Sequence, residues 1–333
     1  MAPLRWGVLG AGIIAHDYVT AMQIFPERHT VVVVGDGNLE NAQKFAKDHN
    51  IPKAVKGDEA VVTDPDVDIV YIAYINTLHY AATKLALEHG KPVLCEKPFA
   101  LNEKQTVELI QLAKTKKLFL MEAIWSRCFP IYKKIREIID SGSIGDVMFL
   151  NANMGYSLQT KERIINKNLG GGALMDMGVY GLQFQQFVFR GLRPTKVVVN
   201  GTLTKTEVDG TSGVLITYPN GQLACIACSA EAELGNEAII AGTKGILRIP
   251  HFWSPDTLIT DEKTYTFELP QSEVPFVYEN GSGMSYEADE VKRCLEEGKL
   301  ECPLITLDET LELVKLRDMM RKSIGVKFNE DDF

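Results

Sequence analysis

The chain has 333 residues, of which 45% are hydrophobic and 24% are charged, and its net charge is -9 at pH 7. This composition is typical of a globular protein with about two domains, and its acidic balance argues against nucleic acid or an anionic membrane surface as a partner. No segment reaches the ~18 apolar residues of a membrane span, and the six cysteines lack a compact disulfide spacing. We therefore expect a cytoplasmic protein with reduced thiols that binds small molecules.

The first motif is a glycine fingerprint near the amino terminus. Residues 5–9 read as a buried strand, and Gly10-Ala11-Gly12-Ile13-Ile14-Ala15 leads from it into a helical segment. This is the G-x-G-x-x-G/A pattern in the strand, turn and helix context that dinucleotide binding requires. Gly10 permits the tight turn, and Gly12 lets a pyrophosphate approach the backbone. The pyrophosphate is expected at the helix start, beside Ile13 and Ile14.

Asp36 bears on the choice of cofactor. It follows the next strand, residues 30–34, at about the distance expected for an acid that binds the adenosine ribose. A carboxylate there accepts hydrogen bonds from the ribose hydroxyls and repels a 2'-phosphate, so the local residues favour NAD over NADP. The structural alternative is a turn-forming aspartate between Gly35 and Gly37.

Strand and helix signals alternate through the first half of the chain. An almost continuous apolar run at 67–75 predicts a strand buried on both faces of a sheet. Asn76 and His79 follow that strand and are expected at the mouth of the cofactor site, although a histidine at a helix start is more often structural. The alternation predicts a doubly wound parallel sheet of the Rossmann type.

Strand signals dominate after residue 147. They predict a mostly antiparallel open sheet with a hairpin turn at Pro219-Asn220-Gly221. We expect an α/β chain with a Rossmann domain at 1–125 and an α+β substrate and dimerisation domain at 126–333, with helix 307–324 packing back on the fold. The expected later strands are 147–154, 196–206, 212–218, 222–230, 237–241, 245–249 and 263–269, and the expected helices are 173–189 and 285–297.

The sequence Glu96-Lys97-Pro98 ends another apolar strand, residues 92–95. Nucleotide-binding sheets present their functional groups at such carboxyl ends, so Glu96 and Lys97 are candidate site residues. A solvated lysine in a turn is the alternative.

A second candidate stretch runs from Gly170 to Tyr180. Three glycines open a helix that carries Asp176 and Tyr180 four residues apart, which places both side chains on one face. An acid and a phenol so placed can bind a polyol and exchange a proton with a carbonyl. A locally satisfied aspartate and a half-buried tyrosine form the structural alternative.

Taken together, these motifs resemble one family. The glycine fingerprint, Asn76 to His79, Glu96-Lys97-Pro98 and Gly171 to Tyr180 occur in the order seen in the glucose-fructose oxidoreductase/inositol dehydrogenase family. The further motif that contributes is Met121-Glu122-Ala123 with Arg127 and Pro130. Longer stretches resemble the animal dimeric dihydrodiol dehydrogenases of that family, namely residues 93–98, 120–125 and 281–288.

The resemblance implies an NAD(P)-dependent oxidoreductase that transfers hydride between nicotinamide and a secondary alcohol or carbonyl. Its expected reactions are oxidation of trans-dihydrodiols or pyranose sugars such as D-xylose, and reduction of dicarbonyls. The alternatives are reduction of a bulkier, steroid-like ketone and a non-catalytic regulator that responds to NAD(P).

By position in the motifs, Lys97 would orient the nicotinamide ribose and the substrate hydroxyl, and Tyr180 would be the general acid/base. A free tyrosine titrates near ~10, so it needs a nearby cation to act near neutral pH. Asp176 would hold the substrate. The remaining residues with an implied substrate role are His79, Trp125 and Arg127.

Two further expectations concern the cofactor and the assembly. The dihydrodiol dehydrogenases usually follow the second strand with alanines and an arginine suited to NADP, whereas this chain has Gly35-Asp36-Gly37. The resemblance thus implies NADP where the local residues favour NAD. It also implies a homodimer through the open sheet, with Phe252, Trp253 and apolar residues of 197–217 as candidates for the interface.

No metal site is expected, because Cys225 and Cys228 lie on opposite faces of a strand.

Overall fold

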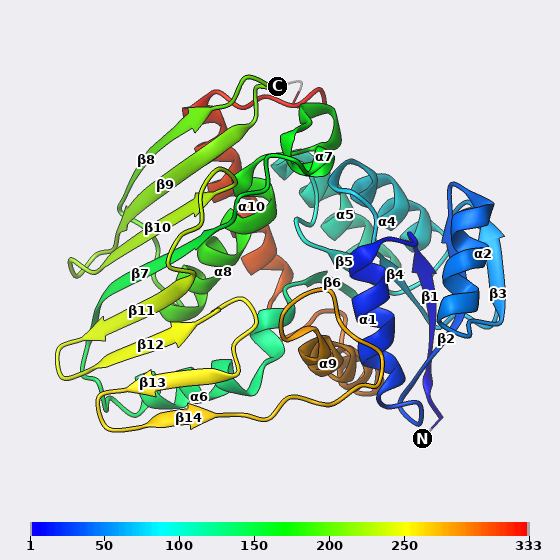
Figure 1. The fold of residues 1–333 in the computed structure, drawn as a ribbon, viewed down its shortest axis with the longest axis horizontal. Coiled ribbons are helices and arrows are strands. Elements are labelled where there is room, and N and C mark those ends of the chain that lie inside the picture. Colours follow the sequence, from blue (N-terminus) through cyan, green and yellow to red (C-terminus); the bar gives the residue numbers. More distant parts are fainter. Residues whose placement is uncertain (1, 332–333) are drawn as a thin grey trace. The chain divides into compact units, whose positions relative to one another are not determined.

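The computed structural model describes residues 2–331, and the chain divides into two compact units. Unit 1 contains the chain up to Ala100 together with Lys104–Cys128 and Leu269–Thr310. Unit 2 contains Leu101–Glu103, Phe129–Glu268 and the chain from Leu311 onward. Figure 1 shows the sheet of each unit with its strands labelled.

Unit 1 is built on a six-stranded sheet in the order β3-β2-β1-β4-β5-β6, and every pair of neighbouring strands is parallel. This is the Rossmann strand order, and the predicted doubly wound sheet is confirmed. Every residue of β4, β5 and β6 is buried, as expected for strands covered on both faces. The strands are β1 (Leu4–Leu9), β2 (His29–Asp36), β3 (Lys53–Lys56), β4 (Ile69–Ile72), β5 (Val93–Glu96) and β6 (Leu120–Ala123).

Helical segments lie between these strands, and one follows the last of them. They are α1 (Ile13–Gln23), α2 (Leu39–Asp48), α3 (Glu59–Val62), η1 (Asn76–Leu78), α4 (His79–Glu88), α5 (Glu103–Lys116) and η2 (Trp125–Cys128).

Residues 269–310 belong to unit 1, although the sequence led us to place them in the second domain. Their elements η5 (Gly281–Gly283) and α9 (Met284–Glu296) pack against α1. The buried carboxylate of Asp17 on α1 accepts hydrogen bonds of 2.9 Å from the Val277 N–H and 2.7 Å from the Tyr278 N–H. These bonds anchor the returning segment to the helix that follows the glycine fingerprint.

Unit 2 contains an eight-stranded sheet in the order β14-β13-β12-β11-β7-β10-β9-β8. All neighbouring pairs are antiparallel except β7 and β10, which are parallel, so the predicted mostly antiparallel sheet is confirmed. The strand expected at 263–269 is present as a shorter strand at Thr264–Thr266, and the strand at Thr257–Thr260 was not predicted. The strands are β7 (Val147–Gly155), β8 (Lys196–Leu203), β9 (Asp209–Thr217), β10 (Leu223–Ser229), β11 (Glu237–Gly242), β12 (Ile246–Pro250), β13 (Thr257–Thr260) and β14 (Thr264–Thr266).

Helices cover one face of this sheet, and α8 packs against β7 and β10. A side chain at Gly181 of α8 would collide with Ile226 of β10, so glycine permits this close approach. The helical segments of unit 2 are α6 (Pro130–Asp140), α7 (Glu162–Ile165), η3 (Lys167–Leu169), η4 (Leu174–Gly178), α8 (Val179–Val188) and the part of α10 (Leu307–Ile324) from Leu311 onward.

Phe252 and Trp253 are buried within unit 2. Phe252 packs against Phe184 of α8, and its carbonyl accepts a hydrogen bond from the Tyr132 hydroxyl at 2.9 Å. The suggestion that these two aromatic residues form an exposed dimer surface is therefore wrong, because they belong to the core. Within residues 2–331, no helix is long and apolar enough to cross a membrane.

Candidate active site

The glycine fingerprint forms the turn between β1 and α1. Gly10 has φ +102°, and a Cβ there would lie 2.8 Å from the carbonyl oxygen of Ala73. Gly12 precedes α1, and a Cβ placed on it would meet no heavy atom of the described residues within 4 Å. Gly10 is thus required by the fold, whereas Gly12 leaves space at the helix amino terminus. That space and the helix N–H groups fit the pyrophosphate of a dinucleotide.

Asp36 ends β2 beside this loop. Its Oδ2 accepts a hydrogen bond of 3.1 Å from the Ala11 N–H, and its Oδ1 accepts one of 2.9 Å from the Asn38 N–H. Asn38 in turn caps α2 by accepting a bond from the Glu40 N–H. The turn-forming role weighed from the sequence is therefore present. The same carboxylate also joins the fingerprint loop to the end of β2, the edge at which adenosine ribose binds in this fold.

Glu96 and Lys97 lie where β5 ends. The Glu96 carboxylate is buried and accepts hydrogen bonds from the Tyr71 hydroxyl at 2.7 Å and from the Lys97 N–H at 3.2 Å. Burial raises the pKa of Glu96 to about 7, against the opposing effects of the Lys97 charge and the Tyr71 hydrogen bond. Lys97 is half-buried and follows this acid at the carboxyl edge of the sheet.

His79 is buried at the start of α4, three residues after the half-buried Asn76. Its Nδ1 lies 2.9 Å from the Pro98 carbonyl oxygen, and its Nε2 lies 2.8 Å from the Tyr74 carbonyl oxygen. A neutral imidazole donates to one of these carbonyls, and only the protonated ring donates to both. The ring thus connects the segment after β4 with the segment that contains Lys97, which is a positioning role.

Trp125 and Arg127 lie in η2, and both side chains are buried. The Arg127 guanidinium donates a hydrogen bond of 3.0 Å to the Leu304 carbonyl and lies 3.3 Å from the Glu309 carboxylate. These partners belong to the segment that returns to unit 1, and they give Arg127 a structural role.

In unit 2, the glycine stretch opens a helix that differs from the expected regular one. Residues Leu174–Gly178 form one turn of π-helix, and α8 starts only at Val179. The Leu174 N–H donates a 2.7 Å hydrogen bond to the buried Asp209 carboxylate at the start of β9. Gly172 has φ +118°, and a side chain there would collide with Asp209. Turns of π-helix occur frequently at functional sites.

Asp176 lies within this turn and pairs with Arg163, whose Nη1 and Nη2 are 2.6 and 3.3 Å from its two oxygens. Tyr180 lies in the first turn of α8 and is 6% exposed. Our sequence reasoning missed Arg163 and Asp209. The sequence offers one signal for Asp209, which is an aspartate just before a run of strand-forming residues. The segment around Arg163 shows no clear pattern.

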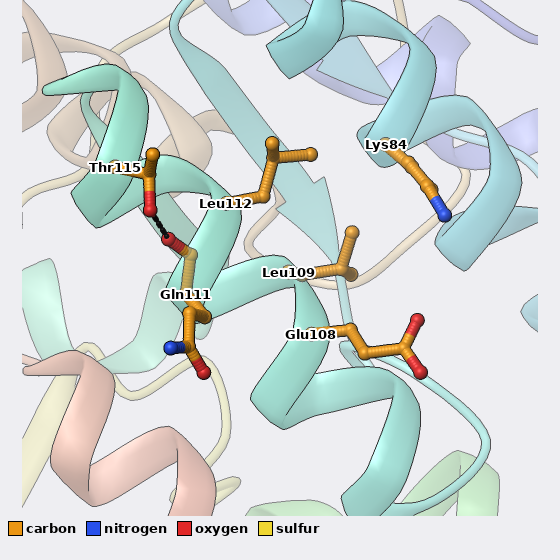
Figure 2. A pocket seen from close by; sticks show the side chains of 6 residues that line it. All are labelled: Lys84, Glu108, Leu109, Gln111, Leu112 and Thr115. Carbon is orange, nitrogen blue, oxygen red and sulfur yellow. Dashed lines mark hydrogen bonds between the residues drawn. The ribbon is translucent and has the colours of Figure 1, made fainter.

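A hollow on unit 1 lies between α4 and α5, and Figure 2 shows the side chains that line it. These side chains lie on helices and not at the carboxyl ends of the strands, so we assign the hollow no part in catalysis. They are Lys84, Glu108, Leu109, Gln111, Leu112 and Thr115.

The parallel sheet and its phosphate loop define a dinucleotide-binding protein. Two family models match the chain: an oxidoreductase family with an NAD-binding Rossmann fold matches residues 4–124, and the GFO/IDH/MocA C-terminal domain matches residues 132–248. The chain belongs to the GFO/IDH/MocA family, as the sequence motifs predicted, and is an NAD(P)-dependent oxidoreductase.

Individual relatives agree with this assignment. The chain is 40% identical over 326 residues to the trans-1,2-dihydrobenzene-1,2-diol dehydrogenase of Xenopus tropicalis, covering 97% of this chain and 99% of the relative. The enzyme of the same name from Homo sapiens is 38% identical over 330 residues, covering 98% and 99%.

Solved structures share the fold at lower identity. An aldose-aldose oxidoreductase from Caulobacter crescentus superimposes with a TM-score of 0.84 at 22% identity, covering 97% of this chain and 98% of that one. The 3-ketoreductase KijD10 from Actinomadura kijaniata, in complex with NADP and TDP-benzene, gives a TM-score of 0.81 at 23% identity, covering 96% and 97%.

Proposed function

We propose that the protein oxidises the secondary alcohol of a trans-dihydrodiol and reduces related carbonyl compounds. The observation that carries this proposal is the presence of both Lys97 and Tyr180 in a chain that matches trans-1,2-dihydrobenzene-1,2-diol dehydrogenases over almost its full length. Pyranose sugars such as D-xylose, and dicarbonyls, are the further substrates that we propose. A nucleotide-responsive regulator needs the glycine fingerprint but no proton-transfer group.

In this proposal Lys97 binds and orients the reactants, and Tyr180 transfers the proton. When bound, NAD(P) supplies the hydride acceptor or donor at its nicotinamide ring. Lys97 orients the nicotinamide ribose and the substrate hydroxyl with its ammonium group. Tyr180 takes the hydroxyl proton at its phenol oxygen during oxidation and returns it during reduction.

Asp176 holds the substrate by accepting a hydrogen bond from a hydroxyl group. Its pairing with Arg163 supports this role, because the two hydrogen bonds from the guanidinium fix the direction of the carboxylate. An ionised carboxylate accepts hydrogen bonds and donates none, which suits a polyol more than an isolated ketone. Trp125 gives the substrate site an apolar surface.

For the cofactor we propose NAD in preference to NADP. Asp36 places a carboxylate at the end of β2 and holds it there through two backbone N–H groups. A 2'-phosphate beside this carboxylate would be repelled, and the following helix offers only Lys44 and Lys47 as compensating cations.

We also propose a homodimer formed through the outer face of the unit 2 sheet. Val198 and Leu215 pair across β8 and β9 on that face and are 48% and 41% exposed. The cross-strand register continues this row through Cys225, Asn151 and Ile239 to Arg248 and Ile259. Five of the seven side chains in this row are apolar, and an exposed apolar surface of this kind is typical of one that is buried by a partner.

The dimer is tested by measuring the molar mass of the protein by light scattering as it elutes from a size-exclusion column. Leu215→Glu should yield a monomer, because it would bury a charge in the apolar end of the row, next to Val198. Leu192→Glu, at an exposed apolar residue outside the strands, is the matched control and should stay dimeric. A monomeric parent protein would contradict the proposal.

The reaction is tested by initial rates with trans-benzene dihydrodiol and with D-xylose, each with NAD and with NADP, followed by nicotinamide absorbance. Turnover of the diol supports the proposal, and faster turnover of xylose assigns the protein to sugar oxidation. A protein that binds the cofactor but turns over neither substrate is either a reductase of a bulkier ketone or a regulator. Assays of a steroid-like ketone with reduced cofactor separate those two alternatives.

A further inference from the structure

A cluster of metal-ligating groups lies in the segment that returns to unit 1. Glu290 and Cys294 are four residues apart on α9 and therefore share one face of the helix. Cys302 follows in the loop between α9 and α10. The Glu290 Oε1 lies 3.6 Å from the sulfur of Cys294 and 3.6 Å from the sulfur of Cys302. The three ligand atoms all lie within 4.8 Å of one another.

The two sulfur–oxygen separations match the requirements of a tetrahedral zinc ion. With Zn–S bonds of ~2.3 Å and Zn–O bonds of ~2.0 Å, tetrahedral angles place sulfur and oxygen ligands ~3.5 Å apart and two sulfurs ~3.8 Å apart. Both cysteines are fully buried, and the Glu290 side chain is 13% exposed. The three ligand atoms are thus gathered in a largely buried position, as a bound ion requires.

We propose that Glu290, Cys294 and Cys302 form a binding site for Zn²⁺ or a similar thiophilic divalent cation, separate from the residues proposed for hydride transfer. Binding releases the two thiol protons to solvent, and each thiolate and one carboxylate oxygen donates a lone pair to the metal. A water molecule completes the four-coordinate shell. The bound group, with two thiolates, one carboxylate and Zn²⁺, carries a net charge of -1.

Arg293 forms an ion pair with one of the three proposed ligands, Glu290. Its Nη2 and Nε donate hydrogen bonds of 2.5 and 2.8 Å to Glu290, so it competes with a metal for that carboxylate. Its Nη1 also donates bonds of 2.7 and 2.8 Å to Glu297. Arg293 therefore keeps an ionic partner when Glu290 turns to the metal. Lys299 also pairs with Glu297 at 2.6 Å, so the two cations and one acid balance the charge of the occupied site.

The site would stabilise the loop that carries Cys302. That loop already contacts the sheet, because the Leu120 N–H donates a 3.1 Å hydrogen bond to the Leu300 carbonyl. It also accepts a bond from Arg127 at the Leu304 carbonyl. A metal bound between α9 and this loop would strengthen a connection that the 3.6 Å contact between Cys302 and Glu290 already makes. Occupancy should therefore raise the melting temperature of the protein.

The test uses the reduced, metal-stripped full-length protein titrated with Cd²⁺, whose thiolate complexes absorb in the ultraviolet, followed by displacement with Zn²⁺. We expect one Cd²⁺ per chain in the parent protein and in the control Cys225→Ser, whose cysteine lies on β10 of unit 2. Cys294→Ser and Cys302→Ser should lose the band.

Absence of the band in the parent protein, or a band of equal size in Cys294→Ser and Cys302→Ser, would overturn the proposal. If a serine variant fails to fold by circular dichroism, Glu290→Gln is the second variant. It should fold and bind Cd²⁺ at least ~10-fold more weakly, and unchanged affinity in this variant counts against the site.

Discussion

The Tyr71 hydroxyl donates a hydrogen bond of 2.7 Å to the buried carboxylate of Glu96, the residue immediately before Lys97. Lys97, which we propose to orient the substrate, therefore directly follows in the chain a buried acid whose pKa is about 7. Burial is the main cause, because it disfavours the ionised carboxylate.

This relationship predicts a pH dependence of stability. The pKa of Glu96 is about 7 in the folded protein, against an ordinary value of 4.5. The folded state therefore binds the proton more tightly than the unfolded chain. The stability contributed by this group is fully present below pH 4.5 and is lost as the pH rises through 7. Glu96→Gln is neutral throughout and should lack this loss, which is on the order of 3 kcal/mol.

Denaturant unfolding of the parent protein and Glu96→Gln across this pH range measures the difference. Glu40→Gln, at an exposed residue of α2, is the control and should follow the parent curve. Parallel curves for the parent and Glu96→Gln would show that Glu96 does not titrate differently in the two states.

The two fingerprint glycines should respond differently to alanine. Gly12→Ala adds a methyl group in open space at φ -92°, so its melting temperature should match that of the parent. The methyl group occupies the pyrophosphate site, and we expect dinucleotide affinity to fall about tenfold or more. Gly10→Ala should instead destabilise the fold by ~1–3 kcal/mol, because it combines a positive φ with a backbone collision at Ala73.

Thermal melting and calorimetric titration with the cofactor separate these effects. Gly12→Ala that binds the dinucleotide as tightly as the parent would place the pyrophosphate elsewhere.

Asp36→Ala should shift cofactor preference toward NADP. The variant removes the carboxylate that faces the 2'-phosphate, and the ratio of kcat/KM for NADP to that for NAD should rise about tenfold or more, or about 1.4 kcal/mol. Asp48→Ala, at an exposed residue of the last turn of α2, is the matched control. An unchanged ratio in Asp36→Ala would restrict this residue to its turn-forming role.

Gly172→Ala tests the support of the π-helical turn. Gly172 and Gly191 both have positive φ, at +118° and +81°, but only at Gly172 would a side chain collide with a neighbouring group, Asp209. Gly191→Ala should cost about 1 kcal/mol from backbone strain alone. Gly172→Ala should cost more and should also reduce kcat, because it displaces the turn that carries Asp176. Equal losses in both variants would argue against the collision.

Local patterns predicted most of unit 1. The apolar strands and the fingerprint are set by neighbouring residues, so their type and order could be inferred from the sequence. The return of residues 269–310 could not, because it depends on Asp17 binding the N–H of Val277, 260 positions away.

In the candidate site, too, residues in local motifs could be predicted, whereas contacts between residues far apart in the sequence could not. Lys97 and Tyr180 were identified by their motifs. The structural role of Arg127 rests on Glu309, 182 residues further along the chain. The π-helical turn likewise depends on Asp209, which caps it from a strand 35 residues later. No local pattern reports such contacts.

Replacement of Lys97 tests the central claim most directly. Lys97→Met should still bind the dinucleotide measurably, and the control Lys84→Met, at a half-buried lysine of α4, should bind it as the parent does. Turnover of trans-benzene dihydrodiol should fall by about 10²–10⁴-fold in Lys97→Met and stay unchanged in Lys84→Met. Parent-like turnover in Lys97→Met would contradict the assignment of Lys97 to the reaction.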